Sequence, residues 1–206
     1  MIELTIDKKD IERIAAKLSK LSVQDQSGAL YSGFVNASLL IENALKQNIS
    51  GTILSVRTGR LKSSIGSMVE SRDNALRAII GSGVRQRGRV KYANIHETGG
   101  TIRPVNVQFL TIPLTAAKTA GGASRFTARD VMEKRTKYLG SFIRNDIIFG
   151  VIQRKRKGSP GKIVPLFVLK TSVDIPARRY MSVTMEQNSQ GVVDIILAQI
   201  GKVLNE

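Results

Sequence analysis

The chain has 206 residues, of which 42% are hydrophobic and 5% aromatic, so it is long enough for one domain with a core of Ile, Leu and Val. It has no cysteine and one histidine, His96, which excludes a disulfide framework, a cysteine nucleophile and a multi-histidine metal site within one chain. The 32 Lys and Arg against 16 Asp and Glu give a formal net charge of +16. That excess favours a polyanionic partner (nucleic acid, an acidic protein surface or an anionic membrane), although a solvated basic surface would account for it as well.

The first part of the chain predicts two amphipathic helices. Apolar residues recur at a spacing of three and four over residues 7–21 and again over residues 27–48. Residues 58–65 are short and polar, as expected of a loop that leads into one helical turn. No apolar run is long enough to span a bilayer, and residues 1–9 lack the pattern of a secretory signal. We therefore expect synthesis in the cytoplasm and no membrane partner.

Strands follow the helices in the predicted order. The apolar segments that predict them are residues 75–84, 91–96, 109–114, 146–153 and 162–173. Residues 154–161 lie between the last two and read as a basic hairpin tip closed by Gly and Pro. Residues 115–140 are expected to be an inserted, flexible segment. A final helix over residues 192–204 is expected to pack on the sheet.

This order predicts a single α+β domain over residues 1–206. Its sheet would be mainly antiparallel, packed by two N-terminal helices and one C-terminal helix. His96 and Glu97 are adjacent, so in a strand they would point to opposite sides, and no paired nucleophile lies near them in the sequence. The glycine clusters fit turns and lack the spacing of a phosphate-binding loop. We therefore expect no enzyme, catalytic residue, cofactor or metal.

Two basic tracts are the candidate interface. Alternation along a strand would place four cations on one face, namely Arg85, Arg87, Arg89 and Lys91. The hairpin tip adds four consecutive cations, Arg154, Lys155, Arg156 and Lys157. Either tract would contact an acidic neighbour or the phosphates of DNA, and electrostatic DNA binding of this kind would be steeply salt-dependent. The alternative for each tract is a solvated loop.

Three short segments resemble a known family. TGRLKSSI (residues 58–65) is similar to its "TG.L..SI" segment, VKYANIHETGG (90–100) to "YA.i.E.GG", and IPARRYM (175–181) to "iPARPFL". FLTIPL (109–114) and PLFVLK (165–170) resemble further segments of one branch. The family is that of the neck and tail-completion (head–tail joining) proteins of tailed phages, including the virion-morphogenesis branch of Mu-like phages. Two residues depart from its pattern, because Arg179 replaces a proline and Tyr180 a phenylalanine.

The third segment has a structural interpretation of its own. Pro176 would end the preceding strand, because proline cannot donate to a sheet. Arg178 would reach a carboxylate or backbone carbonyls as a planar fork. Tyr180 and Met181 would anchor the chain on the core before the last helix. Stapling the fold is the first interpretation of this segment, and a direct interface role is the alternative.

The resemblance implies a non-enzymatic virion protein that joins a ring between the head connector and the tail. Expected partners are copies of itself (a hexamer or dodecamer, by analogy with phage symmetry), the connector or adaptor, and the tail tube or tail terminator. The basic tracts would face these neighbours or the genomic DNA in the channel. The alternative function is a basic nucleic-acid-binding protein.

Overall fold

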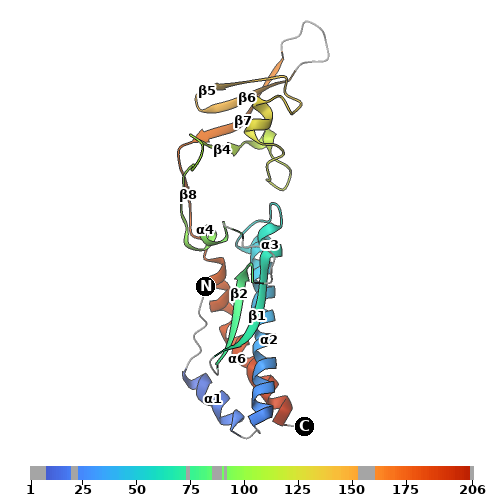
Figure 1. Ribbon diagram of the computed structural model, residues 1–206, viewed down its shortest axis with the longest axis vertical. Helices are drawn as coiled ribbons and strands as arrows, with labels where there is room; N and C mark the ends of the chain where they lie inside the picture. The colour runs from blue at the N-terminus through green and yellow to red at the C-terminus, as the bar shows by residue number, and fades with distance from the viewer. Residues whose placement is uncertain are drawn as a thin grey trace. The chain divides into compact units, whose positions relative to one another are not determined.

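A computed structural model describes residues 8–19, 23–72, 75–84, 90, 92–152 and 161–204. The fold is α+β with antiparallel sheets, as predicted (Figure 1). Contacts divide the chain into two compact units. The helical unit comprises Met1–Thr98 and Ala177–Glu206, and the sheet unit comprises Gly99–Pro176. Whether the two units fold as a single domain stays a prediction.

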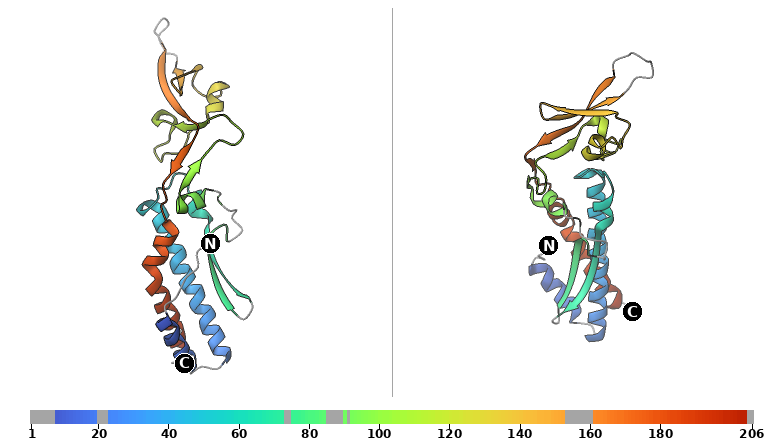
Figure 2. Two further views of the ribbon diagram at one scale, coloured as in Figure 1. Left: turned by 90° about the vertical axis from the view of Figure 1, so that its left-hand side faces the viewer. Right: turned by 45° about the horizontal axis from the view of Figure 1, so that its top comes forward.

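Two long helices form the centre of the helical unit. Helix α2 (Val23–Gln47) runs beside α6 (Tyr180–Leu204), and α1 (Lys8–Leu18) packs against α6 (Figures 1 and 2). Gly33 lies where α2 and α6 approach closely, since a Cβ added there would be 3.2 Å from the Cα of Ile196 in α6. The shared core consists of Ala37, Ile41, Leu45, Val192, Ile196 and Ile200.

A β-hairpin packs on α2. Strands β1 (Ile65–Arg72) and β2 (Ala75–Ser82) pair antiparallel, with Ile65 opposite Ser82. The turns η1 (Asn48–Thr52) and α3 (Arg60–Ser64) connect α2 to this hairpin. Polar groups are buried beneath it, where the Ser67 hydroxyl donates to Glu42 Oε2 at 2.6 Å and Lys46 Nζ donates to Glu42 Oε1 at 2.5 Å. A buried carboxylate needs such partners, so these bonds fix how β1 sits on α2.

The sheet unit contains a four-stranded antiparallel sheet in the order β4-β7-β6-β5. Its strands are β4 (Leu110–Pro113), β5 (Gly140–Arg144), β6 (Ile147–Ile152) and β7 (Lys162–Lys170). A separate pair joins β3 (Gly100–Ile102) to β8 (Val173–Ile175). A register shift between Ile148 and Phe149 lets consecutive residues of β7, Leu166 and Phe167, both be buried.

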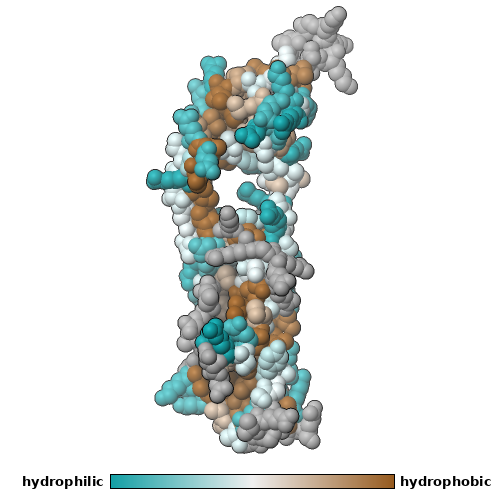
Figure 3. All heavy atoms as spheres, viewed as in Figure 1, coloured by the Kyte–Doolittle hydropathy of each residue, from teal (hydrophilic) through white to brown (hydrophobic). Residues whose placement is uncertain are grey.

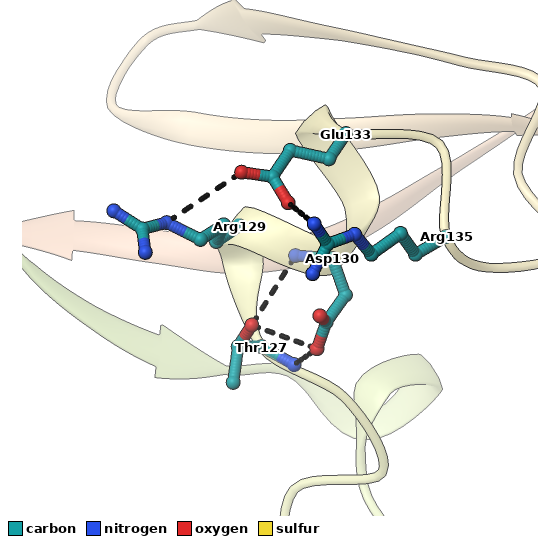
Figure 4. A network of polar contacts seen from close by, with 5 residues as sticks. All are labelled: Thr127, Arg129, Asp130, Glu133 and Arg135. Carbon is teal, nitrogen blue, oxygen red and sulfur yellow. Dashed lines mark hydrogen bonds and ion pairs between the residues drawn. The ribbon is translucent and has the colours of Figure 1, made fainter.

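The segment expected to be a flexible insertion, residues 115–140, covers one face of that sheet. It contains η2 (Thr115–Ala117) and α5 (Ala128–Met132). Thr127 and Asp130 form a capping box at the start of α5, and Glu133 lies between Arg129 and Arg135 at 3.7 and 3.0 Å (Figure 4). Residues of the segment join β6 and β7 in a second core, which consists of Ala117, Ala128, Val131, Tyr138, Ile148, Leu166 and Phe167.

Two predicted elements were wrong. The strand expected over residues 91–96 is replaced by helix α4 (Ala93–Thr98), which ends where Gly99 adopts a positive φ of 72°. The last helix begins at Tyr180 rather than Val192, and its main contacts are with α2. Both elements depend on contacts between segments far apart in the sequence, which the apolar periodicity of a single segment cannot reveal.

Candidate functional site

The basic residues predicted as an interface lie outside the described residues. These are Arg85, Arg87, Arg89 and Lys91 before α4, and Arg154, Lys155, Arg156 and Lys157 between β6 and β7. The strands that flank the second tract are described, and Ile152 pairs with Lys162 in the antiparallel hairpin that the sequence predicted. The roles proposed for both tracts remain predictions.

The third motif segment, in contrast, is described throughout. Pro176 follows directly on β8, as expected, and Arg179 has a positive φ of 48° immediately before α6 begins. Residues 177–179 offer no Ser, Thr, Asp or Asn to cap the helix. The first backbone N–H groups of α6 therefore need an acceptor from elsewhere in the chain.

Glu97 supplies that acceptor. Its Oε2 accepts from the backbone N–H of Met181 at 2.7 Å, and its Oε1 accepts from the N–H of Ser182 at 3.0 Å and from the Ser182 hydroxyl at 2.5 Å. A carboxylate at a helix N-terminus is also favoured by the helix dipole. Glu97 thus acts as a remote cap, 84 residues before Met181 in the sequence.

Backbone bonds join the same two segments. The N–H of Arg178 donates to the carbonyl of His96 at 2.8 Å, and the N–H of Arg179 donates to that of Glu97 at 3.2 Å. Gly99 allows this arrangement, since its positive φ turns the chain away immediately after the two carbonyls. The Glu and the first Gly of the "E.GG" pattern therefore cap α6 and end α4, respectively.

All three motif segments of the helical unit contribute to one apolar cluster. Leu61 and Ile65 come from the first segment, Ala93 from the second and Tyr180 from the third; all four are buried. Val90 and Met181 pack against them. Two hydrogen bonds through the Ser82 hydroxyl link the segments further, to Ser64 Oγ at 2.8 Å and from the N–H of Val90 at 3.0 Å. We call this convergence the motif junction.

Burial and nearby charges at the motif junction favour the neutral forms of His96 and Tyr180. Burial, together with the positive charges of Arg178 and Arg57, lowers the pKa of His96 below its usual value. Burial and the nearby Glu97 carboxylate raise the pKa of Tyr180 to about 12. Neither His96 Nδ1 nor the Tyr180 hydroxyl, both buried, has a hydrogen-bond partner within the described ranges. The ring of Tyr92 meets that of His96 edge-on at 5.9 Å.

This chemistry fits a structural role better than catalysis. Both oxygens of Glu97 already accept hydrogen bonds, and Tyr180 is wholly buried. Arg178 is exposed, and its guanidinium makes no ion pair or side-chain hydrogen bond with the residues that the structure describes, so it is available to a partner. Across the same ranges, no three His, Asp or Glu side chains gather as a metal site.

Sequence reasoning missed the role of Glu97. It treated His96 and Glu97 as neighbours in a strand, whereas α4 directs the Glu97 carboxylate to α6. A signal was present, because a long helix that follows Ala-Arg-Arg has no local cap. Arg178 was expected to bind through its side chain; in the structure its backbone N–H makes the bond instead.

The sequence matches no known protein family and no curated protein, and the structure matches no solved structure. Of the helices in the described ranges, none combines the length and hydropathy needed to cross a bilayer. Any functional assignment therefore depends on the motif segments and on the geometry described above.

Proposed function

We propose that this chain is a structural protein of a tailed-phage virion, located in the neck, where it forms part of a ring that joins the head connector to the tail. Its partners would be further copies in a hexamer or dodecamer, the connector or adaptor, and the tail tube or tail terminator. It would be made in the host cytoplasm and would have no enzymatic activity. Its basic residues would face acidic neighbours or the DNA in the channel.

The motif junction is the observation that supports this proposal. The three segments resemble those of the neck family and lie far apart in the sequence. Hydrogen bonds nevertheless join them, through Ser82 to Ser64 and Val90 and from the N–H groups of Arg178 and Arg179 to the carbonyls of His96 and Glu97. Glu97 and Gly99 have distinct conformational tasks there. Chance similarity in short segments gives no reason for the matched residues to meet.

An early stop codon in the gene of a growing phage tests the proposal. Loss of a joining protein should leave DNA-filled heads and complete tails that accumulate separately, visible by negative-stain electron microscopy. Expression of the wild-type chain from a plasmid should restore joined particles, and mass spectrometry should detect the chain in them. Normal, infectious particles that lack the chain would contradict a virion role.

The alternative, a basic nucleic-acid-binding protein, is supported by the net charge of +16. It predicts tight binding of the purified protein to DNA, with an affinity that falls steeply as salt increases. The neck role predicts weak DNA binding, together with ring formation or association with connector and tail proteins. Titration of duplex DNA between about 50 and 200 mM salt, alongside light scattering for oligomeric mass, separates the two functions.

A further inference from the structure

The four-stranded sheet of the sheet unit has a second apolar face. Residues opposite each other in the register point to the same side of a sheet, and alternate residues along a strand point to opposite sides. Ile148 and Gly150 of β6 face the second core, because Ile148 is buried there and a Cβ on Gly150 would lie 2.6 Å from Leu166 and Tyr138. Phe149 and its cross-strand partners must therefore face the other way.

Eight apolar side chains of that other face form three rows across the strands, and Leu110, opposite Lys170, lies on the same side. We call these eight the outer face: Val151 and Ile163; Phe142, Phe149 and Pro165; Ile147, Val168 and Ile112. Phe142 and Phe149 stack with their ring centres 5.2 Å apart. Phe142 is 40% exposed and Ile163 is 56% exposed. In Figure 3, apolar residues reach the surface in the part of the molecule that holds these strands.

Nothing in the described ranges buries this outer face. None of its eight side chains belongs to either hydrophobic cluster of the described residues, although both clusters include the partly buried side chains around them. From strand spacings of about 4.8 Å and about 3.4 Å per residue, the face measures on the order of 250 Å². This is slightly below the largest apolar patch of a typical monomer, about 300–600 Å², which is often functional.

The outer face is smaller than a stable interface, so a partner must also contact the residues around it. A stable interface covers about 800 Å² on each partner, so a protein that binds here must also contact the residues around the apolar centre. Register places Arg144 and Lys170 on the same side as the outer face, at the end of the sheet that holds Ile147. Both are exposed and, among the described residues, have no acidic partner.

The positive charge of the sheet unit favours an acidic protein over a second copy of the chain or nucleic acid as the partner. The sheet unit has fourteen Lys and Arg against four Asp and Glu. A second copy would bring the same excess close to Arg144 and Lys170, where a screening length of about 8 Å leaves like charges repelling. Nucleic acid would leave the eight apolar side chains without a matching surface. An acidic protein with its own apolar patch would match both the apolar centre of the face and the positive charges around it.

We propose that the outer face of the sheet unit is the docking surface for an acidic partner protein that has an apolar centre. The apolar side chains would provide contact area, and Arg144 and Lys170 would orient the partner and accelerate its association. The inference goes beyond the neck role and does not depend on it. It rests on strand register, exposure and charge.

Photo-crosslinking from adjacent positions of one strand tests the face. The photoreactive residue p-benzoylphenylalanine is placed at Phe142, or at Ser141 as the matched control, in cells that express the chain with its own neighbouring genes. Phe142 points to the outer face, whereas Ser141, opposite Gly150, points to the other side. Position 142 should yield a cross-linked protein with an acidic isoelectric point, identified by mass spectrometry, and position 141 should not.

Binding measurements with that purified partner then test the chemistry. Phe142→Ser should weaken binding at least tenfold, and Arg144→Glu and Lys170→Glu should each slow association at low salt. Arg103→Glu is the charge-matched control, because Arg103 is exposed in the same unit and lies outside the four-stranded sheet. Circular dichroism of each variant confirms that it is folded.

Several outcomes would overturn the inference. They are cross-links from position 142 to another copy, to lipid or to nucleic acid alone; equal cross-linking from positions 141 and 142; and equal loss of binding for the Arg103 and Arg144 variants. The neck role fails separately. A cross-link from position 142 to an acidic protein, together with normal particles from the stop-codon phage, supports the docking surface and contradicts the neck role. Separated heads and tails without a cross-link at position 142 support the neck role and contradict the docking surface.

Discussion

The helical unit and the sheet unit distribute charge differently. The helical unit has eighteen Lys and Arg against twelve Asp and Glu, while the shorter sheet unit has fourteen against four. Several acids of the helical unit serve its own structure, such as Glu42 beneath the hairpin and Glu97 at α6. In the described part of the sheet unit, Arg129 and Arg135 pair with Glu133, and most other cations have no acidic partner. Carboxylates of the helical unit thus stabilise its own fold, whereas most described cations of the sheet unit are left for solvent or a partner.

The two units also differ in the burial of their long-range polar contacts. In the helical unit, hydrogen bonds join residues far apart in the sequence, such as Asn48 to Thr184 at 2.7 Å and Ser67 to Glu42 at 2.6 Å. In the sheet unit, the network of Figure 4 spans only residues 127–135. The long-range bond from Thr101 Oγ1 to Asp174 Oδ1, at 2.6 Å, is exposed. The helical unit should therefore depend on specific long-range polar bonds, and the sheet unit on close packing between its sheet and α5.

Gly150→Ala should have the largest effect and should act on the sheet unit. The new Cβ would lie 2.6 Å from Leu166 Cδ1 and from Tyr138 Cδ1, which is too close without displacement of both side chains. Overpacking of this kind costs about 3 kcal/mol of unfolding free energy. Hydrogen exchange measured by mass spectrometry should show faster exchange in β6 and β7, with little change in α2 and α6.

Gly140→Ala is the control for that substitution. Its Cβ would meet no atom within 4 Å, although Gly140 belongs to the same sheet. We expect unchanged exchange in both units. If Gly150→Ala instead accelerates exchange equally in the helical unit, the two units unfold together and the prediction of a single domain over residues 1–206 is supported.

Glu97→Gln should have the next largest effect, in the helical unit. The substitution keeps the size of the side chain but removes its charge and one of the two acceptor oxygens that cap α6. Lost capping, together with an N–H group left unsatisfied, should lower the unfolding free energy by about 2 kcal/mol. Urea unfolding followed by circular dichroism measures this change.

Glu186→Gln provides the matched comparison. Glu186 pairs with Arg179 at 2.8 Å on the same helix, but both side chains are more than half exposed. Exposed ion pairs contribute little, so the loss should stay below about 0.5 kcal/mol. Equal losses of unfolding free energy for the two variants would contradict the capping role of Glu97.

Local sequence patterns account for much of this fold. The apolar spacing of α2 and the apolar runs of β4, β6 and β7 identify those elements correctly, because each buries a face whose period can be read directly. The same method missed β1 and β5. Neither strand shows a regular alternation of buried and exposed residues, so their burial is set by partners rather than by their own pattern.

The motif junction shows what local patterns cannot supply. The residues of α4 read as a strand, and their helical state is held by backbone bonds from Arg178 and Arg179. The start of α6 likewise depends on Glu97. The importance of these residues was visible as a resemblance, but their pairing was not, since it is a property of the three-dimensional arrangement.

Tyr180→Phe should have a smaller effect, in the opposite direction. The Tyr180 side chain is fully buried, and its hydroxyl has no hydrogen-bond partner in the part of the chain that the structure describes. Removal of an unsatisfied buried hydroxyl should raise the unfolding free energy by about 1 kcal/mol. The resembling family has phenylalanine at this position, which agrees with that direction. A loss of stability, measured by thermal unfolding, would show that the hydroxyl has a partner.

The smallest effect should be the pH dependence that His96 gives to the helical unit. Burial and the charges of Arg178 and Arg57 lower the pKa of His96 in the folded state, so the unfolded chain binds a proton more readily. This contribution to stability is complete above the unfolded pKa of about 6.5 and is lost as the pH falls through the folded value.

The single histidine makes that contribution measurable. In His96→Gln the backbone carbonyl that accepts from Arg178 is retained and only the titrating ring is lost. Between pH 7.5 and 5, the unfolding free energy of the wild type should fall more steeply than that of the variant. Nuclear magnetic resonance of the His96 ring should give a midpoint below 6.5. Parallel stability profiles would mean that His96 has the same pKa in the folded and unfolded states, and would contradict the effect of burial and of Arg178 and Arg57.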